Sequence, residues 1–390
     1  MASVDESVTI DTSDLDQYVG KTFGGGQLRE PVAVNDIRRW VQGMQYPNPL
    51  HYDADYAATT RFGGIIAPQS FMVNTDIGHG SMPSVFGKIP GSHMVFGGDE
   101  WWFYGPRVVP GDQIEVHRRH HDYRVAETRF AGPTVFGRGD NTHVNQRGEV
   151  VSKQRSTSVR YLVEEARRRS HFNQESGVEP TWTKEQLAAL YERRLAWIYS
   201  GRDGATPRWA DVEVGMALPT CPIGPHTIQT FATEWRAFTS VVWGSTKDLW
   251  SNFSGIDGGW LPEMMRDEEL AKIDPSQGDG MFRGASRGHV DDDAASIIGL
   301  PRGYGYGASM GAWALNYAAF WAGNDGLIRH SKLQYRTPPF VGDVTFLDGT
   351  VAGRREDEVL GVNLVTVEVT MTNQDGAIVA SGPVDIELPS

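Results

Sequence analysis

The chain repeats one sequence pattern, and this repeat limits the folds open to it. Residues 51–57 match residues 289–295, because each segment begins with a histidine, has an aspartate two positions later and ends on an alanine. The same offset of 238 residues aligns Met72 with Met310. A pattern kept in register over this distance indicates two copies of one structural module.

Further landmarks follow in the same order in both copies. A Gly-Asp pair at 111–112 matches one at 342–343, and each copy has a later Asn-Gln-x-Gly turn signal. Upstream of the histidines, residues 36–40 resemble residues 234–238. We expect each of these two segments to form the opening turn of an amphipathic helix.

The segment between the two copies is rich in charge. Residues 183–197 have helical spacing, with Thr183 placed to cap the start of a helix and Gln186 to reach back to it. The second copy also carries an insertion that is long for a connection. We predict an N-terminal module at residues 1–163, a helical linker at 164–210 and a C-terminal module at 211–390. The insertion lies within the C-terminal module, at about 241–287.

Each module combines strands with one buried helix. Residues 113–116, 156–161 and 362–372 alternate in polarity or are β-branched, and they are bounded by turn signals, which is typical of antiparallel strands joined by hairpins. Buried helices are expected at 68–78 and 308–322, the second being apolar nearly all round. The expected class is α+β, with an antiparallel sheet wrapped around a long central helix in each module.

Composition excludes several classes of protein. The 390 residues are 39% hydrophobic and 22% charged, which is far from a disordered chain, and the net charge of -13 argues against nucleic acid as a partner. A single cysteine, Cys221, excludes cysteine-rich metal sites. Residues 1–16 lack the features of a signal peptide, and the most apolar stretch, 308–323, is too short to span a membrane. We expect a soluble cytoplasmic protein with no membrane partner and no metal site.

Two motifs of the first copy resemble a known family. Residues 46–53 read Tyr-Pro-Asn-Pro-Leu-His-Tyr-Asp, and residues 62–68 read Phe-Gly-Gly-Ile-Ile-Ala-Pro. Both resemble the MaoC-like R-specific enoyl-CoA hydratases and acyl dehydratases, and the N-terminal half also resembles the dehydratase domain of fungal-type fatty acid synthases. With the repeat, the resemblance covers about 20–162 and 212–388 and implies a double hotdog fold joined by a helical linker.

The resemblance implies a lyase of lipid metabolism, a hydro-lyase acting on an acyl thioester. Such an enzyme adds or removes water at the 2,3 position of an enoyl or 3-hydroxyacyl group carried on coenzyme A or an acyl carrier protein. Charge that develops on the thioester oxygen needs backbone N–H donors, and the C2 proton and the hydroxyl need a base and an acid. No cofactor beyond the thioester carrier is implied. A homodimer, or a hetero-oligomer with another hotdog chain, is expected.

The resemblance places the candidate catalytic residues on the two histidine loops. In the family an aspartate stands five residues before the histidine, whereas this chain has Tyr46 before His51 and glycine before His289. A tyrosine can donate a proton but is a poor base near neutral pH. Asn48 is expected to hold the loop or orient the histidine. In the second copy the nearest upstream Gly-Asp supplies Asp279.

The starts of the two buried helices are the candidate substrate-binding positions. Helix N-termini present N–H groups that can bind a thioester oxygen. In the first copy the candidates are Gly64, Ala67, Gln69 and Ser70, and in the second copy the candidate is Gly307. The aspartates that follow the two histidines are expected to cap short helices instead of taking part in the reaction.

Two other functions fit the same residues. The missing aspartate is what a non-catalytic acyl-binding chain, the partner of an active hotdog subunit, would show. A hotdog thioesterase would need an acidic residue on or beside a buried helix. Asp76 is the only such carboxylate expected in the first copy, and the second buried helix has none.

Overall fold

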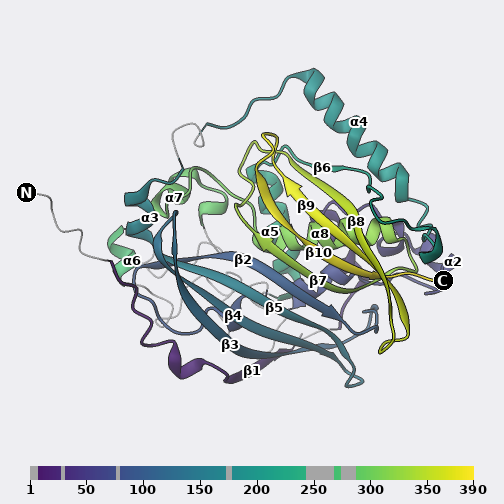
Figure 1. The fold of residues 1–390 in the computed structure, drawn as a ribbon, viewed down its shortest axis with the longest axis horizontal. Helices are drawn as coiled ribbons and strands as arrows, with labels where there is room; N and C mark the ends of the chain where they lie inside the picture. Colours follow the sequence, from purple (N-terminus) through teal and green to yellow (C-terminus); the bar gives the residue numbers. More distant parts are fainter. Residues whose placement is uncertain (1–7, 28–30, 76–79, 173–177, 243–267, 274–286) are drawn as a thin grey trace, which may run out of the picture.

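The strands form one continuous antiparallel sheet. The computed structural model describes residues 8–27, 31–75, 80–172, 178–242, 268–273 and 287–390. Within these residues the strand order is β1-β3-β4-β5-β2-β7-β10-β9-β8-β6, so each copy contributes five neighbouring strands. The two halves join where β2 pairs with β7 (Figure 1). The separate sheet expected for each copy is therefore one half of a shared sheet.

The first copy contributes a sheet of long strands preceded by short helices. Its elements are β1 (Thr22–Gln27), α1 (Val34–Gly43), η2 (Pro49–His51), α2 (Ala54–Thr59), η3 (Gln69–Thr75), η5 (Met82–Ser84), β2 (Ser92–Phe103), β3 (Ile114–Thr128), β4 (Gly132–Asn145) and β5 (Val150–Leu162). Two helices follow, α3 (Val163–Arg169) and α4 (Lys184–Gly201).

The second copy repeats this order of elements. It comprises β6 (Cys221–Ile223), α5 (Ile228–Val242), α6 (Glu268–Ile273), η12 (Arg287–His289), α7 (Asp292–Ile297), α8 (Gly307–Ala322), β7 (Leu327–Tyr335), β8 (Thr345–Asp357), β9 (Val362–Thr372) and β10 (Ile378–Glu387). The strands predicted at 156–161 and 362–372 lie within β5 and β9, and the one predicted at 113–116 forms the start of β3, which begins at Ile114. Gly148 and Gly376 stand at equivalent hairpin turns with φ of 76° and 78°, a conformation that favours glycine.

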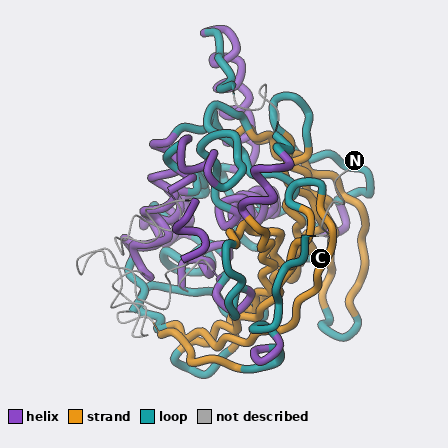
Figure 2. Tube along the Cα trace, turned by 90° about the vertical axis from the view of Figure 1, so that its left-hand side faces the viewer, coloured by secondary structure: helices purple, strands orange, loops and turns teal. Residues whose placement is uncertain are grey.

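The sheet curves around helices that gather on one of its faces (Figure 2). Helix α8 is buried nearly all round, as its apolar sequence predicts, and packs against strands of both copies. The long buried helix predicted at 68–78 in the first copy is wrong, because residues 69–75 form a 3-10 helix. Val73 and Thr75 are β-branched, and the Thr75 hydroxyl donates to the Met72 carbonyl, which weakens α-helix formation.

Helices α1 and α5 pack directly against each other. A Cβ at Gly43 would lie 2.5 Å from the Cβ of Ala237, so the glycine allows the close approach. Helix α5 begins at Ile228, which places Glu234 in the middle of the helix and not in its opening turn. The proposed match of 36–40 with 234–238 is therefore wrong by about one helical turn, because a short stretch of amphipathic sequence fits several helical registers.

Helix α4 connects the two copies along the outside of the molecule (Figure 1). Thr183 and Gln186 form the predicted capping box at its start. The Arg194 guanidinium donates to the carbonyl of Gln45 in the first copy and to that of Pro222 in the second. Helix α4 therefore contacts both copies. Within the described residues, no helix is both long and apolar enough to cross a bilayer.

Candidate functional site

His51 is held in one orientation by the loop that carries it. The Asn48 side chain caps the short helix η2 by accepting a hydrogen bond from the Leu50 N–H at 3.0 Å. The Nδ1 of His51 then lies 2.8 Å from the Ile66 carbonyl oxygen, so Nδ1 carries the proton and Nε2 keeps its lone pair. Burial lowers the pKa of His51 to about 3, so the imidazole is neutral at physiological pH.

Tyr46 lies beside this imidazole. The two ring centroids are 5.2 Å apart, and both side chains are buried. Burial raises the pKa of Tyr46 to about 12. A hydrogen bond with Asn48 and the positive charge of Arg107 act in the opposite direction and lower this pKa by less than burial raises it. Tyr46 is therefore a protonated phenol at physiological pH and can donate a proton. Within the described part of the chain, no carboxylate is hydrogen-bonded to His51 or Tyr46.

A residue of the second copy fixes the position of Asn48. The Asn48 amide donates to the Asn324 side-chain oxygen at 3.2 Å, and Asn324 donates to the Tyr56 hydroxyl at 2.8 Å. Asn324 follows α8, so the histidine loop of the first copy is tied to the second copy at this point. These contacts hold the loop, which is one of the two roles expected for Asn48.

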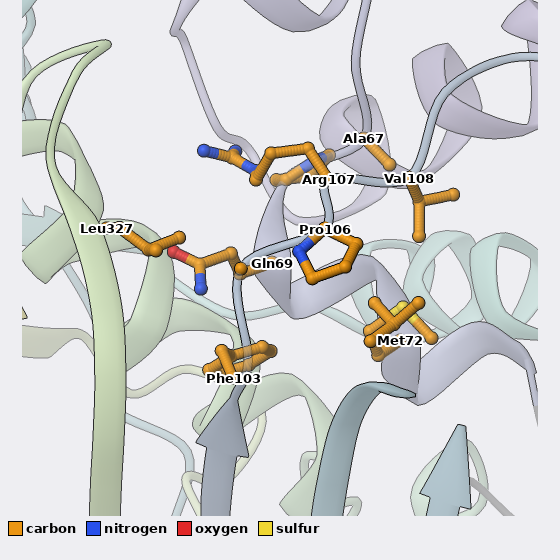
Figure 3. A pocket seen from close by; sticks show the side chains of 11 residues that line it. Ala67, Gln69, Met72, Phe103, Pro106, Arg107, Val108 and Leu327 are labelled. Atoms are coloured by element: carbon orange, nitrogen blue, oxygen red, sulfur yellow. The ribbon is translucent and has the colours of Figure 1, made fainter. Parts of the chain in front are cut away.

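A small pocket lies beside Arg107 (Figure 3). Its empty volume is about 260 Å³ with the mouth included, and it is lined by Ala67, Pro68, Gln69, Met72, Phe103, Gly105, Pro106, Arg107, Val108, Val151 and Leu327. Most of this lining is apolar, with one amide and one guanidinium. Arg107 also affects the pKa of Tyr46 and that of His51, so it connects the pocket with the pair. Sequence reasoning left Arg107 unassigned.

The predicted substrate-binding residues of the first copy divide into two groups. Ala67 and Gln69 line the pocket, but the N–H of Ala67 donates to the Val108 carbonyl. The Ser70 hydroxyl donates to Asn316, so its side chain is part of the packing between η3 and α8. Gly64 lies in the loop before η3 and outside the pocket lining.

The Gln69 side chain connects the two copies. Its amide nitrogen donates to the Ile328 carbonyl at 2.8 Å, and its oxygen accepts from the Ile328 N–H at 2.9 Å. Both hydrogen bonds reach strand β7. Both the nitrogen and the oxygen of the side-chain amide are thus engaged with strand β7.

The histidine of the second copy has the same orientation in different surroundings. The Nδ1 of His289 lies 2.7 Å from the Tyr304 carbonyl oxygen, and its ring packs on those of Tyr304 and Tyr306 at 4.1 and 3.8 Å between centroids. Gly307, which begins α8, approaches β2 closely, because a Cβ there would lie 2.3 Å from that of Phe96. Asp279 and Asp76 lie outside the described residues.

The aspartates that follow the histidines cap helices, as predicted. Asp53 accepts from the Tyr56 N–H and Asp291 from the Ala294 N–H, both at 3.0 Å. These equivalent contacts match the sequence offset of 238 residues. Both carboxylates are therefore engaged in capping.

Sequence reasoning missed a buried carboxyl beside α8. Glu234 on α5 is 1% exposed, and its Oε2 accepts a hydrogen bond from the Ser309 hydroxyl at 2.6 Å. Burial raises the pKa of Glu234 to about 8. The second buried helix itself carries no carboxylate, as expected, but α5 places one beside it. The sequence match had placed Glu234 in the opening turn of a helix and not at a buried position.

Sequence comparisons agree with the motifs of the first copy. Residues 17–154 match the family model described as FAS1-like, dehydratase domain region. A probable enoyl-CoA hydratase alpha subunit of Thermomonospora curvata is 29% identical over 161 residues, which is 38% of this chain and 50% of that protein. The match thus spans about half the length of this curated relative.

Similar solved structures span nearly the whole chain. A MaoC-like dehydratase aligns with a TM-score of 0.62 at 16% identity and covers 96% of this chain and 100% of its own. A Mycobacterium tuberculosis protein described as a double hotdog fold aligns at 0.53 and 11% identity, covering 96% and 98% of the two chains. A putative MaoC domain dehydratase from Chloroflexus aurantiacus aligns at 0.51 and 12% identity, covering 95% of each. Residues 17–154 therefore match the FAS1-like dehydratase domain region, and the chain as a whole has a double hotdog fold.

Proposed function

We propose that this chain is a hydro-lyase that adds water to, or removes it from, the 2,3 position of an acyl thioester. The thioester is carried on coenzyme A or on an acyl carrier protein. One observation carries the proposal: the Nδ1–H of His51 donates to Ile66, which leaves the Nε2 lone pair beside the Tyr46 phenol. A fixed proton acceptor next to a proton donor is what reversible hydration requires.

The two side chains divide the proton transfers. In hydration, His51 Nε2 accepts a proton from the water whose oxygen bonds to C3, and the Tyr46 hydroxyl donates a proton to C2. The imidazolium then returns its proton to the Tyr46 phenolate, which closes the cycle. In dehydration the proton first moves from the Tyr46 hydroxyl to His51 Nε2, so that the phenolate takes the C2 proton and the imidazolium protonates the departing hydroxyl. Arg107, half-buried at the pocket, carries positive charge toward the oxygen on which negative charge develops. Proton transfer of this kind needs no metal ion and no redox cofactor.

The second histidine loop and the protein's setting complete the proposal. His289 and Asp279 are the candidate pair of the second copy, with Gly307 at the start of α8. We place the enzyme in the cytoplasm, in lipid metabolism, as a homodimer or with a second hotdog chain. The Thermomonospora curvata relative is described as an alpha subunit, which supports such a hetero-oligomer.

One observation favours a second candidate function, that of a non-catalytic acyl-binding subunit. Burial lowers the pKa of His51 to about 3, and a base is most effective when its pKa lies near the working pH. Tyr46 also stands at the position where the family that this chain resembles has an aspartate. A chain that binds acyl thioesters and supports an active partner would have these features. The thioesterase alternative is less favoured, since Glu234 is closed off from solvent.

Hydration of trans-2-enoyl-CoA thioesters tests the enzyme directly. The enoyl absorbance is followed for short, branched, aromatic and steroid-like acyl groups, with the wild type, His51→Ala, Tyr46→Phe and His289→Ala. We expect His51→Ala to lower kcat by about 10²–10⁴, the usual contribution of general acid–base catalysis, and Tyr46→Phe to act in the same direction.

The two histidine variants serve as controls for each other, because each one changes the histidine of one copy and leaves the histidine of the other copy in place. Loss of turnover in His289→Ala alone would place the reaction in the second copy. A folded, monodisperse wild type without turnover on any thioester would contradict the enzymatic proposal. Turnover that appears only after a second hotdog chain is added would support the subunit alternative.

A further inference from the structure

Helix α4 runs along the outside of the molecule between the two copies (Figure 1). Residues 184–189 at its start are exposed, whereas Leu190 and Trp197 further along are buried against the body of the protein. Arg194 lies between them on the same face, because residues three or four positions apart are neighbours on a helix. The contacts of this face gather around Tyr46, which is more than a simple connector needs.

Arg194 holds the backbone just before Tyr46. One arm of its guanidinium donates to the Gln45 carbonyl, and the other arm donates to the Pro222 carbonyl at 3.1 Å. The N–H of Tyr46, in the same peptide unit as the Gln45 carbonyl, donates to the Val41 carbonyl at 2.8 Å. The peptide unit that joins Gln45 to Tyr46 is therefore hydrogen-bonded at both ends, and its oxygen is bonded from the linker helix.

The conformation of Gln45 depends on such contacts. Its φ is 53°, in the left-handed region that a residue with a Cβ rarely adopts. A strained backbone of this kind persists only where its surroundings hold it. If Arg194 were removed, Gln45 could relax toward a common conformation, and this change would move Tyr46, the next residue in the chain.

The ring of Tyr46 is supported from the same helix. Trp197 of α4 packs on Phe320 of α8 with 4.5 Å between ring centroids, and Phe320 meets the Tyr46 ring edge-on at 6.1 Å. The Arg194 guanidinium lies over the Trp197 ring, 4.6 Å from its centroid. Gly201 at the end of α4 allows the close packing, since a Cβ there would lie 2.9 Å from the Phe320 ring.

The turn that follows α4 reaches the other end of the histidine loop. The Gly204 carbonyl accepts from the Asn324 N–H at 2.9 Å, and the Asp203 carbonyl accepts from the Tyr56 hydroxyl at 2.7 Å. Asn324 in turn accepts from the Asn48 amide. The linker therefore supports the loop both before Tyr46 and at Asn48.

Arg194 affects the position of Tyr46 and not its charge. The pKa of Tyr46 is set by burial, by Asn48 and by Arg107. Arg194 donates to a backbone carbonyl instead, and it is not part of the pocket lining that the described residues form. Its removal should therefore change the geometry of the proton donor more than the binding of substrate.

We propose that Arg194 is a positioning residue for the reaction, because it fixes the backbone before Tyr46 and so holds the phenol beside the His51 imidazole. This inference rests on the proposed function, since it takes Tyr46 to be the proton donor of hydration. It goes further by giving the linker helix a part in the active site, although the helix does not contact the substrate.

Two neighbouring arginines of α4 provide the variant and its control. Arg194→Met removes both hydrogen bonds, and Arg193→Met removes a guanidinium that lies over the Phe346 ring of the second copy, 5.0 Å from its centroid. Hydration of a trans-2-enoyl-CoA is measured with the full chain. We expect Arg194→Met to lower kcat by about tenfold to a hundredfold, the effect of misplacing a reacting group, with KM within about twofold. Arg193→Met should change neither.

A double-mutant cycle separates positioning from a general loss of structure. If Arg194 acts through the Tyr46 hydroxyl, Arg194→Met should lower kcat by less than about twofold once Tyr46→Phe has removed that hydroxyl. An equal loss of kcat in both backgrounds would overturn the inference, because it would show that Arg194 acts independently of Tyr46.

The remaining outcomes distinguish the inference from the proposed function. Equal kcat in Arg194→Met and Arg193→Met, or a loss that appears only in KM, would overturn the inference and leave the proposed function standing. A wild type without turnover would instead overturn the proposed function. Urea denaturation shows whether each variant is folded. If Arg194→Met is not, Arg194→Lys keeps the charge and one donor arm, and it should show a smaller loss of kcat with KM unchanged.

Discussion

His51 and Ile66 are joined by a hydrogen bond of 2.8 Å between the Nδ1 of the imidazole and the backbone carbonyl, and His289 and Tyr304 are joined by the same bond at 2.7 Å. Both pairs are 15 residues apart in the chain. The two copies therefore present their histidines with the same ring nitrogen bonded. What differs is the surroundings, since His51 packs against a buried tyrosine and His289 is only half-buried between two tyrosines.

The pH dependence of hydration follows from the burial of His51. Its pKa is lowered to about 3, so the imidazole stays neutral from about pH 4 upward. The kcat/KM of the wild type should therefore show no acid limb near 6.5, the ordinary pKa of histidine. Initial rates from pH 5 to 9 check this. A break near pH 6.5 in the wild-type profile would contradict the prediction.

Two equivalent aspartates should differ in their contribution to stability. Asp343 pairs with the buried Arg302 at 2.8 Å, whereas Asp112 pairs with Arg147, which is 48% exposed. Removing Asp343 leaves a buried cation without its carboxylate, so Asp343→Ala should lower the free energy of unfolding by about 3–5 kcal/mol. Asp112→Ala should cost less, because water can solvate the freed guanidinium. Urea denaturation of both variants measures the difference, and equal losses would contradict it.

The stability of the fold should depend on the hydrogen bond that the Gln69 amide donates to Ile328. Gln69→Glu keeps the shape, but an ionised carboxylate cannot donate to the Ile328 carbonyl, which is buried. We expect a loss of about 2–4 kcal/mol in the free energy of unfolding at pH 8, because a buried acceptor loses its partner and a charge is buried. The loss should shrink at pH 5, since a protonated Glu can donate. A loss independent of pH would show that shape alone matters.

Glu234 should make the fold less stable as pH rises. Its pKa is raised to about 8 from 4.5, so the folded state holds a proton that the unfolded state has released between these values. The stabilisation is complete below about pH 4.5 and is lost as pH rises through about 8. Glu234→Gln removes this loss, so the variant should be more stable than the wild type by about 3–5 kcal/mol at pH 8.5 and about equal at pH 4.5. Equilibrium denaturation of both proteins at pH 4.5 and pH 8.5 measures this difference, and a difference that does not change with pH would contradict the prediction.

Sequence patterns predicted the parts of the fold that depend on local residue order. The strands, the helix at 308–322, the caps at Asp53 and Asp291 and the hairpin glycines were all readable, because alternation, apolar runs and capping residues act over a few positions. The helix expected at 68–78 was not, since β-branched and polar residues tilt that segment toward a 3-10 helix. The predicted position of Glu234 in its helix was wrong for a different reason, because a short amphipathic match does not fix where a helix starts.

The sequence by itself determined that the chain has two equivalent modules and that each presents a histidine and an aspartate in the same order. Only the tertiary structure decided what those residues meet. Arg107 joins Tyr46 and His51 because a loop distant in sequence brings it there, and Gln69 reaches Ile328 in the other copy. Burial and long-range contacts set the pKa of each group and the partners of each polar atom, and neither is encoded in local residue spacing.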